Sequence, residues 1–138
     1  MTAYLALFAW SFLAATILPL ASEPMLVALV RLRGDMLAPV LVATAGNYLG
    51  ACTTYWLARV AARRVDAVST TLTHHARARG MLERFGQPAL LLSWVPILGD
   101  AIVAVAGGVG VRFAPFSAWV MAGKLARYTA VGWVASQV

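Results

Sequence analysis

A broken apolar segment that occurs twice is the feature that most restricts the fold. In the first, the run from Pro19 to Pro24 interrupts an apolar stretch whose only side-chain charge is Glu23. In the second, Pro96 lies four residues before Asp100, which is the only charge between Phe85 and Val111. Proline inside a helical stretch removes a backbone hydrogen bond and breaks or kinks the helix. We therefore expect two interrupted segments rather than two straight helices.

The composition places both segments in a membrane. Of the 138 residues, 62% are hydrophobic and 12% are charged, which lies outside the usual range of a soluble domain. Three apolar stretches have the length and polarity that a bilayer demands: 1–30, 36–58 and 85–111. A fourth, 113–138, carries Lys124 and Arg127 in its middle. We expect a single-domain, all-α integral membrane protein. No basic residue precedes the first stretch, so we expect it to remain in the mature chain rather than act as a signal peptide.

Helix length indicates how the broken segments lie. Splitting residues 2–33 at the prolines leaves arms of about 16 residues, or about 24 Å of helix, against a hydrocarbon core of about 30 Å. A re-entrant hairpin fits better than two crossings. We predict hairpin 2–33 and spanning helix 36–58 in repeat one (1–62), then a connector (63–80). Repeat two (81–138) has hairpin 81–112 and spanning helix 115–137.

The two halves align at one offset. Pro96 and Pro19 are separated by 96 − 19 = 77 residues. The same offset pairs Ser22 with Gly99, Glu23 with Asp100, Gly46 with Gly123, and Asn47 with Lys124. Because the segments alternate in direction, we predict an inverted repeat of two hairpins, each followed by a transmembrane helix. Transporters of this layout bind substrate where the broken helices of both repeats meet near the midplane.

Four charges are the leading site candidates. An ionisable group at mid-membrane usually serves a pathway or a proton relay, which favours a functional role for Glu23 and Asp100. Capping of a half-helix N-terminus is the alternative. Lys124 and Arg127 share one helix face and are the expected counter-charges. The alternative is that Arg127 extends to the membrane edge. Such a cluster can exchange protons or bind an anionic headgroup, and the sequence leaves both uses open.

Other residues complete the predicted site. The hairpin tips contain Pro19, Ser22, Pro24, Pro96 and Gly99. Small residues allow close helix approach, so Gly46, Gly50 and Gly123 are assigned to packing. Asn47 lies in the same small-residue stripe, and as the counterpart of Lys124 we expect it to line the site.

The net charge of +6 is a topology signal rather than a nucleic-acid signature. Basic residues concentrate between the second and third apolar stretches, which predicts that connector 59–84 is cytoplasmic and that both termini are external. Cys52 is a lone cysteine, and His74 and His75 are adjacent and point about 100° apart on a helix. We expect no metal and no cofactor.

Four motifs resemble the short YqaA-type branch of the DedA superfamily, the VTT or SNARE-associated-like proteins. They are Ser22-Glu23, residues 46–50 (GNYLG), residues 91–100 (LLSWVPILGD) and residues 123–128 (GKLARY). The resemblance implies an inner-membrane protein related to those that move polyprenyl phosphates or phospholipids between leaflets. Larger members carry arginines on both sides of the second proline, where this chain has Ser93 and Gly99. Larger members also have flanking helices that are absent here.

The leading functional hypothesis is a transporter that moves a lipid or lipid-linked anion between leaflets, coupled to protons through Glu23 and Asp100. The alternatives are a small-solute or ion transporter and a non-transporting membrane-homeostasis or assembly factor. An intramembrane hydrolase is disfavoured, because that chemistry uses two aspartates on spanning helices and here one acid is Glu23. The expected partners are membrane lipids and a second copy of the chain, in a homodimer or higher oligomer, with no nucleic acid.

Overall fold

The computed structural model describes residues 1–16, 21–64, 76–95 and 97–137, and within these ranges every regular element is helical. This confirms the all-α prediction. The elements are α1 (Thr2–Ala14), α2 (Glu23–Arg33), α3 (Leu37–Arg64), α5 (Ala76–Phe85), the 3-10 helix η2 (Gln87–Trp94), α6 (Leu98–Gly108) and α7 (Phe113–Gln137).

The short helices α2 and α6 are local counterparts. Each has 11 residues and carries an acid in its first turn, Glu23 in α2 and Asp100 in α6. A negative charge near a helix N-terminus is favourable, and Pro24 is well suited to the first turn because its missing N–H has no partner there. Helix α2 ends at Gly34, whose φ of 66° provides a left-handed cap.

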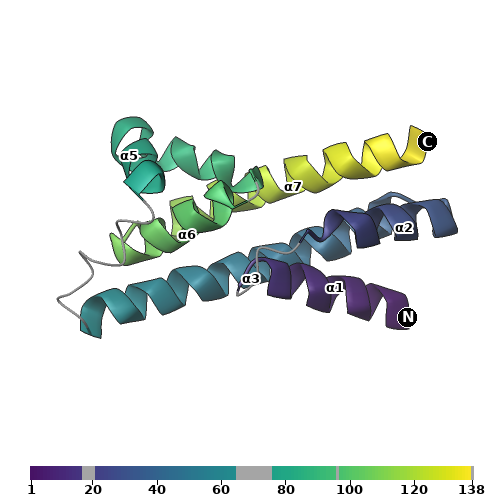
Figure 1. Cartoon of the computed structure of the whole chain (residues 1–138), viewed down its shortest axis with the longest axis horizontal. Coiled ribbons are helices and arrows are strands. Elements are labelled where there is room, and N and C mark those ends of the chain that lie inside the picture. The colour runs from purple at the N-terminus through teal and green to yellow at the C-terminus, as the bar shows by residue number, and fades with distance from the viewer. Residues whose placement is uncertain (17–20, 65–75, 96, 138) are drawn as a thin grey trace.

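The long helices α3 and α7 run side by side in opposite directions and form the body of the molecule (Figure 1). They have 28 and 25 residues, which correspond to about 42 Å and about 38 Å of helix. The N-terminus, the α2–α3 junction and the C-terminal end of α7 lie at one end of the molecule (Figure 1). The C-terminal end of α3 lies at the other.

The short elements pack in a crossed pattern. Helix α1 packs on α3 and η2 packs on α7, so the first arm of each broken segment lies against the long helix that follows it. The second arm of each broken segment packs instead on the long helix of the other half: α2 lies mainly against α7, and α6 lies against α3. Each long helix therefore contacts both broken segments, and the two halves interlock.

Two hydrophobic cores result from this packing. One contains Tyr55, Leu90, Ile102 and Phe116, and the other contains Leu7, Leu26, Val40 and Tyr128 among their buried members. Apolar side chains also cover the outside of both long helices: Leu41, Leu49, Leu57, Met121, Leu125, Trp133. Contiguous exposed apolar surface marks an interaction with lipid or with another chain.

None of the helices in the described ranges is both long and apolar enough to cross a membrane.

Two boundaries and one internal break differ from the sequence prediction. Helix α3 continues to Arg64 rather than ending at residue 58, because the basic residues after Ala58 are compatible with helix. Helix α5 spans the boundary predicted between connector and hairpin at residues 80 and 81. Within the predicted hairpin 81–112, Gly86, with φ of 67°, separates α5 from η2, a break that the sequence pattern did not indicate. The rest of the predicted connector, residues 65–75, lies outside the described residues.

Candidate functional site

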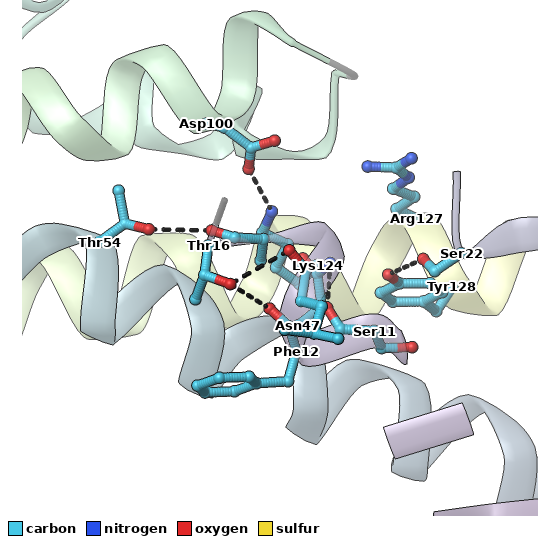
Figure 2. Close-up of polar contacts among 12 residues, drawn as sticks. Ser11, Phe12, Thr16, Ser22, Asn47, Thr54, Asp100, Lys124, Arg127 and Tyr128 are labelled. Carbon is cyan, nitrogen blue, oxygen red and sulfur yellow. Dashed lines mark hydrogen bonds and ion pairs between the residues drawn. The ribbon is translucent and has the colours of Figure 1, made fainter. Parts of the chain in front are cut away.

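Two cations on α7 are paired with the acids of the two broken segments. Lys124 Nζ lies 3.5 Å from Asp100 Oδ1 at the start of α6, as Figure 2 shows. Arg127, less than one turn further along α7, forms an ion pair with Glu23 at the start of α2. The predicted counter-charges are therefore those that the structure brings together. One face of α7 therefore contacts the acids at the starts of both α2 and α6.

The two ion pairs differ in burial. The side chain of Lys124 is 1% exposed, whereas Asp100 is 36% exposed. Arg127 and Glu23 are more evenly covered, at 14% and 24%. A buried ammonium loses its hydration, and one carboxylate at 3.5 Å offsets only part of that loss. Lys124 is thus a desolvated cation with a partner that reaches the surface, which is a suitable arrangement for binding an anion.

Glu23 and Asp100 lie in the first turns of α2 and α6, but within the described residues neither carboxylate accepts a capping hydrogen bond from a backbone N–H. The N-cap positions of α2 and α6, Ser22 and Ile97, make no side-chain capping hydrogen bond. The contacts of Glu23 and Asp100 run instead to the cations of α7. The arrangement favours the charge-pairing interpretation over capping alone.

Tyr128 extends the polar face of α7. Its hydroxyl lies 2.6 Å from Ser22 Oγ, and the tyrosine ring is fully buried in the core around Leu26. Helical spacing could have identified this residue, since Tyr128 follows Lys124 by four positions and so shares its face. Tyr128 is thus a residue of the candidate site that was not among the predicted site residues.

Asn47 faces α1. Its Nδ2 donates a hydrogen bond to the carbonyl oxygen of Ser11 at 3.0 Å, while its Oδ1 has no partner among the described residues. The hydroxyls of Ser11 and Ser93 are likewise buried without a partner there. Buried polar groups are nearly always satisfied by protein or by water. These three polar groups, on α1, α3 and η2, are able to hold water or a ligand.

Glycines bring backbones into contact around the site. A Cβ on Gly46 would lie 2.5 Å from the carbonyl oxygen of Phe8, and one on Gly50 would lie 2.4 Å from that of Phe12. On α7, a Cβ on Gly123 would lie 2.7 Å from the carbonyl oxygen of Leu91. Each first arm thus meets its long helix at a glycine.

Gly99 has a specific steric role. A Cβ there would lie 2.4 Å from the carbonyl oxygen of Ser93, so any side chain would require the backbone to shift. An arginine at this position, which the resemblance implies for larger members of the family, would not fit this packing. Ser93 itself is buried and lies beside Gly123, where Oγ would be 2.9 Å from an added Cβ.

The tip prolines are only partly described. Pro24 lies in the first turn of α2 and is exposed. Pro19 and Pro96 lie outside the described residues. Ile97 has φ of 67° and ψ of −57°, a conformation that is strained for a β-branched residue.

The described residues contain no group of three or more His, Cys, Asp or Glu side chains able to hold a metal ion.

Comparison with known proteins identifies the family. The described residues form an all-helical bundle in which two ion pairs link α7 to the starts of α2 and α6. The VTT domain profile matches residues 18–136, which is most of the chain. The chain belongs to the VTT-domain, or DedA, family and is a member of the YqaA type.

Three relatives support this assignment. The inner membrane protein YqaA of Escherichia coli is 41% identical over 128 residues, covering 91% of this chain and 85% of the relative. The inner membrane protein YqaA of Shigella flexneri gives the same values. An uncharacterized protein of Haemophilus influenzae is 39% identical over 133 residues, covering 91% of this chain and 82% of that protein. No solved structure matches the chain.

Proposed function

We propose that this protein is a bacterial inner-membrane transporter that moves a lipid or lipid-linked anion between leaflets, coupled to proton exchange. The observation that carries the proposal is the pairing of two cations on one face of α7 with acids of two different broken segments. Lys124 and Arg127 would hold the anionic group of the substrate. Asp100 and Glu23 would take up and release protons.

The membrane location is supported by the family and by the surface. Two relatives carry the name inner membrane protein, and the long helices expose apolar side chains. The polar residues that lower the hydropathy of α3 and α7, Asn47 and Lys124 among them, face the interior of the bundle. We place the arginine-rich segment 59–84 in the cytoplasm and both termini outside.

The packing pattern supports an inverted repeat of two re-entrant hairpins. Helices α2 and α6 match in length and in the position of their acid, and each packs on the long helix of the other half. A movement of either broken segment against the long helices changes one ion pair while the other holds. Alternating access of the two tips to the two leaflets follows from such movements.

Exchange of partners at Lys124 gives the proposed coupling. While Asp100 is ionised, its carboxylate is the counter-ion of Lys124. Protonation of Asp100 removes that negative charge and leaves the buried ammonium without a partner, which favours a substrate anion in its place. Loss of the proton restores the carboxylate, which then displaces the anion. Glu23 exchanges its proton in the same way opposite Arg127, so each acid takes up and releases one proton per cycle.

Reconstitution into phospholipid vesicles tests the proposal. The unmutated protein should move a labelled anionic phospholipid between leaflets, and Asp100→Asn should lower the rate of that movement at least about tenfold. A non-transporting assembly factor is the alternative, and it would leave lipid movement at the level of protein-free vesicles in every variant.

A further inference from the structure

At one end of the bundle Tyr55 and Arg59 of α3 pack with Phe113 and Phe116 of α7 in a cluster that we call the plug. The hydroxyl of Tyr55 donates to the carbonyl oxygen of Val111 after α6, and Arg59 Nη1 donates to the same carbonyl at 3.1 Å. The Tyr55 ring stacks on Phe116 at a centroid distance of 4.3 Å and lies 5.7 Å from Phe113. The C-terminal end of α3 is thereby fixed to the α6–α7 junction.

The opposite end contains a cavity of about 400 Å³ between the C-terminal end of α2, the α2–α3 junction and the last turns of α7. Six residues line it: Val30, Arg31, Gly34, Met36, Ala135, Ser136. This is the size of a small-molecule pocket, which ranges from about 300 to 1,000 Å³.

The cavity occupies the position of the plug in the other half. With the offset of 77 residues, Tyr55 corresponds to Gly132 and Arg59 to Ser136, since 132 − 55 and 136 − 59 both equal 77. Val111 corresponds to Gly34 in the same way (111 − 34 = 77). Both large plug side chains are replaced by small ones. Met36 and Val40 fill the space beside Gly132, whereas Ser136, in the place of Arg59, lines the cavity.

Arg31 supplies the charge of this cavity. Its side chain lines the cavity at the exposed end of α2 and forms no ion pair within the described residues. The other polar groups there are occupied: Gly34 N–H donates to the carbonyl of Val30, and Ser136 Oγ donates to that of Trp133. The nearby acid Asp35 accepts a hydrogen bond from the Leu37 N–H at 3.0 Å.

We propose that this cavity binds the phosphate of an anionic phospholipid headgroup at the surface of the outer leaflet. The guanidinium of Arg31 forms paired hydrogen bonds with phosphate oxygens, and the apolar wall of Val30 and Met36 receives the adjoining glycerol and chain. The inference rests on the proposed function, since it assigns the lipid a place to bind before it reaches Lys124.

Binding of phosphatidylglycerol to the detergent-solubilised full-length protein, measured by native mass spectrometry, tests the site. Arg31→Gln should lower the affinity about tenfold, the loss expected for hydrogen bonds to a charged group. Arg33→Gln is the matched control, because Arg33 is in the same turn but lies over the Tyr4 ring, outside the cavity. Its affinity should remain within twofold of that of the unmutated protein.

A second variant separates the effect of the cavity's shape on lipid binding from the effect of positive charge. Ser136→Arg places an arginine where the other half has Arg59, so it should fill the cavity and lower phosphatidylglycerol binding although it adds a positive charge. Increased binding by Ser136→Arg, or equal losses in Arg31→Gln and Arg33→Gln, would indicate general surface charge and overturn the proposal. Phosphatidylcholine should bind more weakly than phosphatidylglycerol, because it has no net negative charge.

The source of the phosphate is distinguished by competition. Soluble glycerol phosphate should fail to displace phosphatidylglycerol, because it lacks the chain that contacts the apolar wall. Displacement at equal concentration would assign the cavity to a soluble phosphate and contradict the lipid proposal. Failure of transport with intact phosphatidylglycerol binding would count against the proposed function alone, since the binding measurement requires no lipid movement.

Discussion

Arg127 of α7 forms an ion pair with Glu23 at the start of α2, a residue 104 positions earlier in the chain. The last helix of the chain therefore fixes the first broken segment. Both side chains are mostly covered, so the pair lies inside the bundle rather than on its rim. Its strength determines how tightly α2 is held against α7.

A double-mutant cycle measures this coupling. Glu23→Gln and Arg127→Gln should each destabilise the purified protein by about 2 kcal/mol, below the 3–5 kcal/mol of a fully buried pair because both side chains retain some exposure. The double variant should lose less than the sum, with an interaction energy of about 1 kcal/mol. Thermal unfolding in detergent gives the values. Additive losses of unfolding free energy would show that the interaction between Glu23 and Arg127 contributes nothing to stability.

Removing one or the other partner of the Asp100–Lys124 ion pair should destabilise the protein by different amounts. Asp100→Asn leaves the buried ammonium of Lys124 without a counter-ion, whereas Lys124→Met removes the buried charge and leaves a carboxylate that reaches the surface. We expect Asp100→Asn to be the more destabilising by about 1 kcal/mol. Comparing the midpoints of thermal unfolding of the two variants checks the sign. Greater loss in Lys124→Met would contradict the burial argument.

Gly99 should not tolerate a side chain. Gly99→Ala places a methyl group 2.4 Å from the Ser93 carbonyl oxygen and should cost about 2 kcal/mol. Gly108→Ala is the control in the same helix, because nothing lies within 4 Å of its Cβ position. It should be neutral or slightly stabilising, since alanine favours helix over glycine. Equal unfolding temperatures for the two variants would refute the close approach.

The Tyr128 hydroxyl should stabilise the first broken segment. Tyr128→Phe removes the hydrogen bond to Ser22 and leaves that buried hydroxyl unpaired, at a cost of about 1 kcal/mol. Hydrogen exchange at the start of α2 should rise in this variant while exchange in α6 stays unchanged. Tyr4→Phe, in which the ring under Arg33 is kept, is the control and should alter neither region. A uniform rise across both helices would indicate general destabilisation.

Much of this arrangement could be predicted from patterns in the chain. Proline and a nearby acid in an apolar stretch identified both break points, and α2 and α6 begin where those acids lie. The shared helix face of Lys124 and Arg127 identified them as counter-charges. These predictions depend on local geometry, which sequence spacing determines directly.

The remaining features depend on tertiary packing. Spacing does not specify that Arg127 pairs with the acid of the other half, nor that Asn47 donates to a carbonyl of α1. The break at Gly86 was missed because glycine alone is a weak signal inside an apolar run, and only its positive φ reveals the turn. Tyr128 was missed because a tyrosine in an apolar helix is typical of a core position.

Movement of a labelled anionic phospholipid between leaflets of reconstituted vesicles tests the central claim most directly. Glu23→Gln and Asp100→Asn should each lower the rate at least about tenfold, the loss expected when a positioned proton-transfer group is removed. Asp35→Asn is the control: Asp35 is exposed, and asparagine can also accept the Leu37 N–H, so its rate should match that of the unmutated protein. Unchanged rates in folded Glu23→Gln and Asp100→Asn proteins would contradict the account.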